Sequence, residues 1–123
     1  MPYLKNTDKY VIIETPIMQV YVIVILITTP TLTEAKKISK ALIESKKAAC
    51  VNIIKDIESQ FYWQNKIQKE KEVLLVIKST KRHFKDIIKI TKKYHSYKIP
   101  EIIALPLVVA DNAYLNWIRK VLT

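Results

Sequence analysis

Residues 50–79 constrain the fold of this chain more than any other stretch, because they contain two long alternating runs separated only by Gln64 and Asn65. Alternation of apolar and polar residues with a period of two is typical of a strand with one buried face. Asparagine tolerates the positive φ that a tight turn requires. The pattern therefore predicts one long β-hairpin. The odd-numbered apolar positions, predicted to share one face of each strand, are Val51, Ile53, Ile57, Phe61 and Trp63, with Lys55 and Ser59 as exceptions, and then Ile67, Val73, Leu75 and Ile77.

The predicted hairpin is long for a small domain. About fourteen residues at roughly 3.3 Å each give an arm on the order of 45 Å. One domain of this size cannot cover such an arm, whose far end carries Phe61, Tyr62 and Trp63. Exposed strands with aromatic side chains favour pairing with another chain. Self-association is therefore expected, and part of the function is expected to lie between chains.

Composition limits the classes of function. The 123 residues suffice for one domain, and 50% of them are hydrophobic. The strongest apolar run, residues 20–27, is well short of the roughly 18 to 20 residues that a bilayer requires. The absence of glycine excludes a glycine-rich phosphate loop, and the single cysteine excludes an internal disulfide. We expect a cytoplasmic protein without a membrane span, and organelle targeting by residues 1–19 stays open.

The rest of the chain alternates strands and helices. Strands are predicted at 20–29 and 101–109, where Pro106 indicates an edge position or an irregularity. Helices are predicted from a Thr31–Glu34 capping box to about residue 46, over 81–95, and at the C-terminus after Asp111 or Asn112. Residues 1–19 show no period and are predicted to be an N-terminal tail, with one domain over 20–123. The order predicts an α+β fold, the ferredoxin-like duplicated βαβ sandwich with an extra C-terminal helix.

The net charge of +10 raises the possibility of nucleic-acid binding. In residues 81–100, seven lysines and arginines stand against the single carboxylate Asp86. However, ferredoxin-like RNA-binding modules stack bases on aromatic residues of a glycine-containing third strand, and residues 71–79 contain neither residue type. Lysines on outer helix faces are usually only solvated. Nucleic acid is therefore not an expected partner.

His95 and Glu101 are the candidate metal ligands. They flank a short connector, and an imidazole with a carboxylate can ligate a divalent cation. Two groups are too few for a closed site, so further ligands would have to come from a neighbouring chain or from water. The alternative is that His95 simply ends a helix, where the helix dipole favours it. His83 is predicted to be an exposed residue at the start of that helix.

Catalytic chemistry has little support in the sequence. Cys50 begins an apolar strand, where it is expected to be a small hydrophobic residue, and no Ser/His/Asp arrangement is present. Trp63, Lys78, His95 and Glu101 are expected to converge only if chains assemble, which would form a polar binding cleft. No catalytic residue and no enzymatic activity are predicted.

Five segments together resemble the CutA divalent-cation-tolerance family. They are AACVNI at 48–53, FYWQNKI at 61–67, EVLLVIKS at 72–79, HSYKIPEIIALPL at 95–107 and YLNWI at 114–118. The resemblance covers about residues 20–121. It implies a ferredoxin-like homotrimer whose hairpin arms pair across chains, as in the assembly of the signal-transduction protein PII. It also implies tolerance to copper or another divalent cation, with no enzymatic reaction and no organic cofactor.

The resemblance also assigns residues. His95 matches the histidine of the family's His-Pro-Tyr pattern, and Glu101 the acid of its Pro-Glu pair, which implies metal binding by both. Ser96 stands in place of the pattern's proline and is expected to loosen the connector. Asn65 replaces the usual turn glycine, and Ile27 replaces a cysteine proposed as a copper ligand in some members, which weakens the case for Cu(I). The implied cleft and interface residues are Tyr62, Trp63, Lys66, Glu72, Lys78, Tyr97 and Pro100.

Three hypotheses follow from the sequence. The first is a non-enzymatic, trimeric protein that binds copper or another divalent cation at clefts between subunits. The second is a PII-like sensor that binds an anionic metabolite through Lys78 and neighbouring lysines, an analogy at the level of the fold. The third is an assembly module whose function is the trimer itself.

Overall fold

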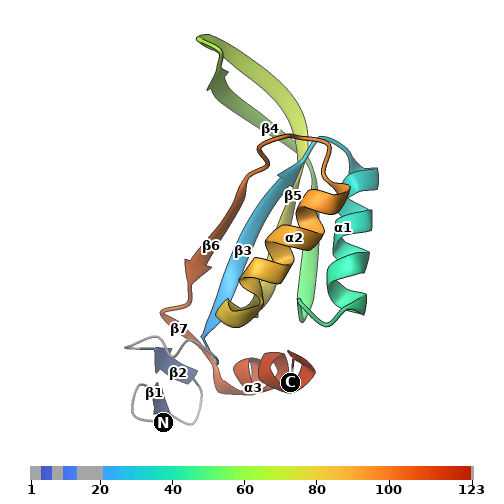
Figure 1. Cartoon of the computed structure of the whole chain (residues 1–123). Coiled ribbons are helices and arrows are strands. Elements are labelled where there is room, and N and C mark those ends of the chain that lie inside the picture. The colour runs from blue at the N-terminus through green and yellow to red at the C-terminus, as the bar shows by residue number, and fades with distance from the viewer. Residues whose placement is uncertain (1–3, 7–9, 14–20, 123) are drawn as a thin grey trace.

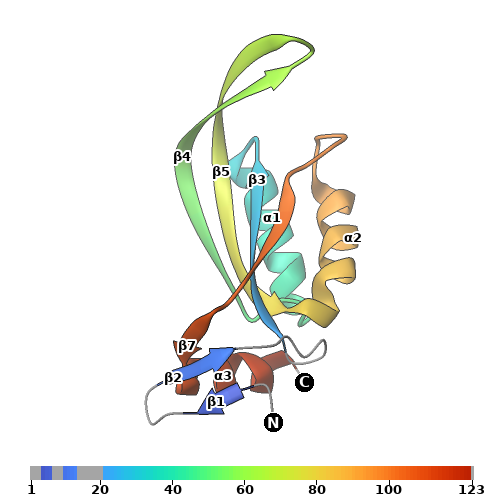
Figure 2. The same cartoon turned by 90° about the vertical axis from the view of Figure 1, so that its left-hand side faces the viewer.

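The structure, a computed structural model, describes residues 4–6, 10–13 and 21–122. In Figures 1 and 2, α1 and α2 cover one face of a sheet, and the hairpin β4–β5 projects beyond the rest of the molecule. The elements are β1 (Leu4–Asn6), β2 (Tyr10–Ile13), β3 (Val22–Thr29), α1 (Leu32–Glu44), β4 (Cys50–Trp63), β5 (Lys66–Thr80), the 3₁₀ turn η1 (Lys81–His83), α2 (Phe84–Tyr94), β6 (Ile102–Pro106), β7 (Val109–Asp111) and α3 (Asn112–Leu122).

The main sheet has four antiparallel strands in the order β4-β5-β3-β6. The units β3-α1-β4 and β5-α2-β6 each contribute two strands and one helix. This arrangement confirms the predicted α+β, ferredoxin-like fold with its additional C-terminal helix. Pro106 ends the edge strand β6, as its missing N–H requires.

The core lies between the sheet and the helices α1 and α2. Alternate residues of β3 face these helices, because successive side chains of a strand point to opposite faces. Val51 and Ile53 of β4 pack against the same core. A second, smaller cluster joins Val22 to α3. The main core includes Ile23, Ile25, Ile27, Ala35, Ile38, Leu42, Leu75, Ile77 and Ile87.

The helix starts follow the predicted capping pattern. The hydroxyl of Thr31 accepts a hydrogen bond from the backbone N–H of Glu34 at 3.2 Å, so the capping residues of α1 are confirmed. A carboxylate oxygen of Asp111 accepts the N–H of Tyr114 at 3.0 Å and caps α3. The second helix differs from the prediction, because residues 81–83 form the 3₁₀ turn η1 before α2 begins.

The predicted long hairpin is confirmed. Gln64 and Asn65 connect β4 to β5 with φ angles of 52° and 63°, the left-handed pair of a type I′ turn. Asparagine is among the residues that adopt this conformation most readily. A glycine-free chain therefore still makes the tightest hairpin connection.

A β-bulge in β4 changes which side chains share a face. Ile54 pairs with Leu74 and Ile57 with Glu72, so Lys55 and Asp56 together oppose one residue of β5. Asp56 has a φ of 58°, the left-handed conformation that admits the extra residue.

Beyond the bulge, every side chain of β4 moves to the other face. The prediction that the odd positions of the first strand share one face is therefore wrong past Asp56. Val51 and Ile53 face the helices, whereas Phe61 and Trp63 face the opposite side.

The predicted N-terminal tail contains two short strands. β1 pairs with β2, and β2 pairs with β7, in a second antiparallel sheet. Strands of 3 and 4 residues are too short to show an alternation of apolar and polar residues in the sequence. The other tail residues, 1–3, 7–9 and 14–19, lie outside the described part of the chain, and the boundary at residue 20 stays a prediction.

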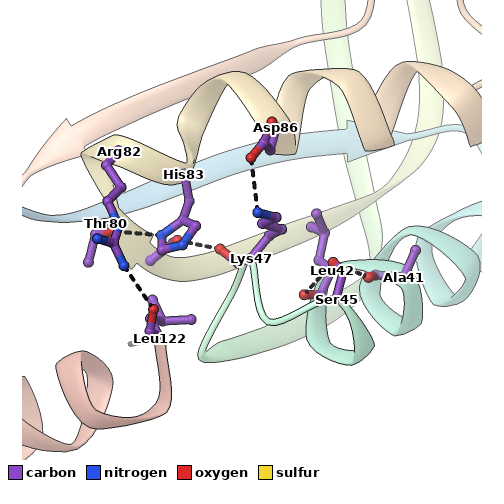
Figure 3. A network of polar contacts seen from close by, with 10 residues as sticks. Ala41, Leu42, Ser45, Lys47, Thr80, Arg82, His83, Asp86 and Leu122 are labelled. Carbon is purple, nitrogen blue, oxygen red and sulfur yellow. Dashed lines mark hydrogen bonds and ion pairs between the residues drawn. The ribbon is translucent and has the colours of Figure 1, made fainter. Parts of the chain in front are cut away.

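His83 is buried, contrary to the prediction that it is exposed. In the tight turn η1, residues three apart lie above one another, so His83 reaches back to the Thr80 hydroxyl, 2.7 Å from its Nδ1. Figure 3 shows His83 between Lys47 and the end of β5. Lys47 also forms an ion pair with Asp86 at 3.0 Å, and Arg82 donates to the carbonyl of Leu122 at 3.2 Å. These contacts join the loop after α1 to α2, and η1 to α3, at one end of the sheet.

Candidate functional site

The far half of the hairpin and the connector of residues 95–101 line a cleft of about 850 Å³. The connector runs at the end of the sheet from which the hairpin projects (Figures 1 and 2). Beyond the bulge at Lys55 and Asp56, alternate residues of β4 face the same side as Gln68, Glu70 and Glu72 of β5. The hairpin wall includes Ser59, Phe61, Trp63, Gln68, Glu70 and Glu72, and the connector wall includes Ser96, Tyr97, Lys98, Ile99 and Glu101.

His95 fastens the connector to the sheet. Its Nδ1 lies 3.1 Å from the backbone nitrogen of Tyr97 and accepts that N–H. The ring proton is then on Nε2, which donates to the carbonyl oxygen of Thr28 at 2.7 Å. The ring is 8% exposed. A metal ion could bind His95 only if one of these two hydrogen bonds were given up, so the geometry assigns His95 a positioning role in this chain.

The connector is also held by Glu34, at the start of α1. The carboxylate of Glu34 accepts the backbone N–H of Ser96 at 2.6 Å and lies 3.2 Å from the Thr31 hydroxyl. Proline has no N–H to donate. The serine at position 96 therefore adds a contact that the family's proline lacks, and the expectation that it loosens the connector is not supported by this geometry.

Tyr97 joins the two walls of the cleft. Its hydroxyl donates to Oε2 of Glu72 at 2.9 Å, and its ring centroid lies 5.0 Å from that of His95. Burial, followed by the hydrogen bond and charge of Glu72 and then the charges of Glu70 and Glu34, raises the pKa of Tyr97 to about 12. Tyr97 is therefore a stable hydrogen-bond donor at neutral pH.

Glu72 is the most unusual residue of the cleft, because it is a carboxylate only 6% exposed. Among the described residues, its one hydrogen bond is to Tyr97, and none of them forms an ion pair with it. Burying a charge without an opposite charge is costly. Glu70 and Glu101 line the same cleft, so negative charge is concentrated here although the chain as a whole carries +10. The cleft therefore favours a cation.

The structure brings together some of the predicted site residues and separates others. Trp63, Glu72, Tyr97 and Glu101 line one cleft, and His95 contacts the lining residue Tyr97. The predicted residues Tyr62, Lys66, Lys78 and Pro100 do not line it.

Tyr62 is next to Trp63 in β4, so its side chain is on the opposite face of the hairpin, and it is 75% exposed. Lys66 pairs with Trp63 beside the turn. Lys78 donates to the side chain of Asn52 and lies six residues from Glu72 along β5, about 20 Å away.

Sequence reasoning missed Phe61 and Glu70 as residues of the cleft. Gln68, Glu70 and Glu72 did share one parity in the sequence, which indicated a common polar face. The bulge that turns Phe61 toward this face had no counterpart in the alternating pattern.

In the part of the chain that the structure describes, no three His, Cys, Asp or Glu residues form a group that could hold a metal ion. One copy of the chain therefore does not assemble a closed metal site from these residues. The pair His95 and Glu101 stays a prediction, and a complete site would need ligands from a second chain or from water.

The matching family model agrees with this architecture. Residues 23–121 match the model described as CutA1 divalent ion tolerance protein. This chain belongs to the CutA family. The family resemblance seen in the sequence is thereby confirmed.

Relatives of this CutA chain include bacterial and plant proteins. "Divalent-cation tolerance protein CutA" of Thermus thermophilus is 40% identical over 97 residues, which are 79% of this chain and 94% of that protein. "Protein CutA, chloroplastic" of Arabidopsis thaliana is 36% identical over 98 residues, or 80% of this chain. Those residues are 54% of the plant protein, so this chain spans about half the length of that relative.

Solved CutA structures have the same fold. The Thermus thermophilus structure has a TM-score of 0.79 at 39% identity, over 80% of this chain and 96% of that one. The CutA1 structure from Oryza sativa has a TM-score of 0.81 at 35% identity, over 84% and 94% of the two chains. The strands β1 and β2 of this CutA chain precede the residues that the family model matches.

The location of this CutA chain in the cell stays a prediction. None of the helices in the described residues is long and apolar enough to cross a bilayer. The Arabidopsis relative is named as chloroplastic.

Proposed function

We propose that this CutA protein is a homotrimer that binds divalent cations at clefts between its subunits, as part of a response to those cations and without catalysing a reaction. The observation that carries the proposal is Glu72, a nearly buried carboxylate with no cationic partner among the described residues. A bound cation would supply the missing opposite charge.

The trimer is supported by the uncovered face of the main sheet. The helices α1 and α2 cover one face of this sheet (Figure 2). By strand register, the other face carries apolar side chains from all four strands. Ile54, Ile103 and Leu105 are 46%, 48% and 49% exposed. An apolar sheet face normally packs against another layer. Further copies of the chain would provide that layer. The face comprises Val24, Leu26, Ile54, Leu74, Val76, Ile103 and Leu105.

The donor atoms of the cleft fit a divalent cation in part. Glu70, Glu72 and Glu101 offer carboxylate oxygens, which accept hard and intermediate cations. Soft Cu(I) is less well matched, because the position at which the family resemblance implies a cysteine in some members holds Ile27, which is fully buried in the core. A second subunit or water would have to complete the coordination shell. The proposed ligands are therefore Cu(II), Zn(II) or a similar divalent ion rather than Cu(I).

Calorimetric titration with Cu(II) and Zn(II) tests this function. Glu72→Gln keeps the size of the side chain and removes its charge, so it should weaken cation binding markedly. Glu58→Gln is the matched control, because Glu58 is exposed on β4 and opposes Lys71 on the other face of the hairpin. Equal affinities in the wild type and both variants would refute cation binding at the cleft.

An anionic metabolite held by Lys78 finds no support in this cleft. The Lys78 ammonium group is hydrogen bonded to Asn52 on the uncovered sheet face. The lining of the cleft carries three glutamates against the single cation Lys98, which disfavours an anion.

A further inference from the structure

We propose that the cleft admits an organic ammonium compound with more than one positive charge, one of its nitrogens lying against Glu72 beside the rings of Phe61, Trp63 and Tyr97. The inference rests on the part of the proposed function that makes the cleft a cation site, and it does not require that the cation be a metal ion. It names a ligand class that differs from a bare metal ion in size and in the contacts it makes.

The first observation is the aromatic lining. Phe61 and Trp63 are two residues apart on the same face of β4, about 7 Å from each other, and Tyr97 belongs to the opposite wall. In the single chain these residues are 39%, 51% and 36% exposed, although aromatic rings of this size normally lie in a core. Aromatic faces attract ammonium groups within about 6 Å, and the attraction grows in a desolvated site. An aromatic lining contributes little to the binding of a hydrated metal ion.

The second observation is the free oxygen of Glu72. Its Oε2 accepts the Tyr97 hydroxyl, whereas Oε1 has no hydrogen bond to any described residue. Glu72 lines the cleft, so this oxygen can accept a donor from a ligand. An ammonium group offers up to three N–H donors and a full positive charge. One such contact would satisfy both the unused oxygen and the uncompensated charge.

The third observation is the size and charge distribution of the cleft. About 850 Å³ is within the range of cavities that hold organic ligands and is far more than a single ion occupies. Glu70 lies two residues from Glu72 on the same face, about 7 Å away, and Glu101 is on the other wall. Carboxylates spread along a cleft match several ammonium groups on one molecule better than one metal ion, which needs its ligands to converge.

The intact protein can be tested with spermidine as the probe. The chain has two tryptophans, so in a Trp117→Phe background Trp63 alone reports on the cleft. Spermidine should change Trp63 fluorescence saturably, and triethylene glycol, an uncharged chain of similar length, should not. Glu72→Gln should weaken spermidine binding about 10-fold to 100-fold, because it removes the negative charge that strengthens the hydrogen bond to the ammonium group. Glu58→Gln, with the same loss of charge outside the cleft, should leave the affinity unchanged.

The outcomes separate this inference from the proposed function. Binding of Zn(II) with no response to spermidine would overturn the ammonium site and leave divalent-cation binding intact. If the protein binds spermidine but binds neither Zn(II) nor Cu(II), the result would support the ammonium site and overturn the metal proposal. If Glu72→Gln dissociates the oligomer in light scattering, a neighbouring chain fills the cleft, and the ammonium site is wrong.

Discussion

His95 holds the connector of residues 95–101 in place through both of its ring nitrogens. Both of its ring nitrogens bond to backbone atoms, one from β3 and one from the connector. We expect His95→Ala to lower the free energy of unfolding by about 1 to 3 kcal/mol, since two hydrogen bonds of ordinary strength are lost. Urea unfolding in metal-free buffer, at equal protein concentrations, measures the change. A residue that served only as a metal ligand would leave this free energy unaltered.

His83 makes a prediction about pH. Burial, followed by the charges of Arg82 and Lys47, lowers the pKa of His83 below its ordinary 6.5, and Asp86 opposes this only weakly. Below pH 6.5 the unfolded chain therefore binds more protons at this residue than the folded chain. Stability should fall as the pH drops through this range.

His83→Gln removes the titrating group and keeps a side chain that can bond to Thr80. The variant should lose less stability than the wild type between about pH 7 and pH 5. Urea unfolding across that range decides the question, and identical pH profiles for the two proteins would show that His83 does not cause the loss.

At the scale of elements, the bulge in β4 determines which side chains reach the cleft. Asp56 has a φ of 58°, which a β-branched residue adopts only with strain. Asp56→Val should therefore destabilise the protein by about 1 to 2 kcal/mol or remove the bulge, which would turn Phe61 and Trp63 away from the cleft. Asp56→Gly is the control that keeps the conformation. Unfolding experiments and Trp63 fluorescence in the Trp117→Phe background test both effects, and equal behaviour of the two variants would contradict this account.

The elements differ in how far the sequence determines them. The hairpin and its turn were predictable, because Gln64 and Asn65 separate two alternating runs. The bulge was not, because Val51, Ile53, Ile57, Phe61 and Trp63 keep one parity across it, and the extra residue shows only in the pairing with β5. The strands β1 and β2 are too short to give a period. The contact between Tyr97 and Glu72 joins residues 25 apart in sequence, so no local pattern could reveal it.

At the scale of the whole molecule, the two layers have opposite character. The helices α1 and α2 present exposed lysines outward, whereas the free face of the sheet is apolar. The hairpin extends past both layers (Figures 1 and 2). A chain with this shape buries its apolar face and its projecting arm together when copies associate sheet to sheet. In the proposed trimer, the subunit contacts and the cleft would therefore be linked, since the same hairpin would contribute to both.

This link can be tested with two variants, one that introduces a lysine on the free sheet face and one that introduces a lysine on the helix layer. Ile103, on the free sheet face, is 48% exposed, and Ile43, on the outer side of α1, is 42% exposed. A lysine is tolerated at either position in an isolated chain but is strongly disfavoured where association buries it without a partner. We expect Ile103→Lys to reduce the mass measured by light scattering from that of three chains toward that of one, and Ile43→Lys to leave it unchanged. A stable trimer in Ile103→Lys would show that the free sheet face is not the surface through which the chains associate.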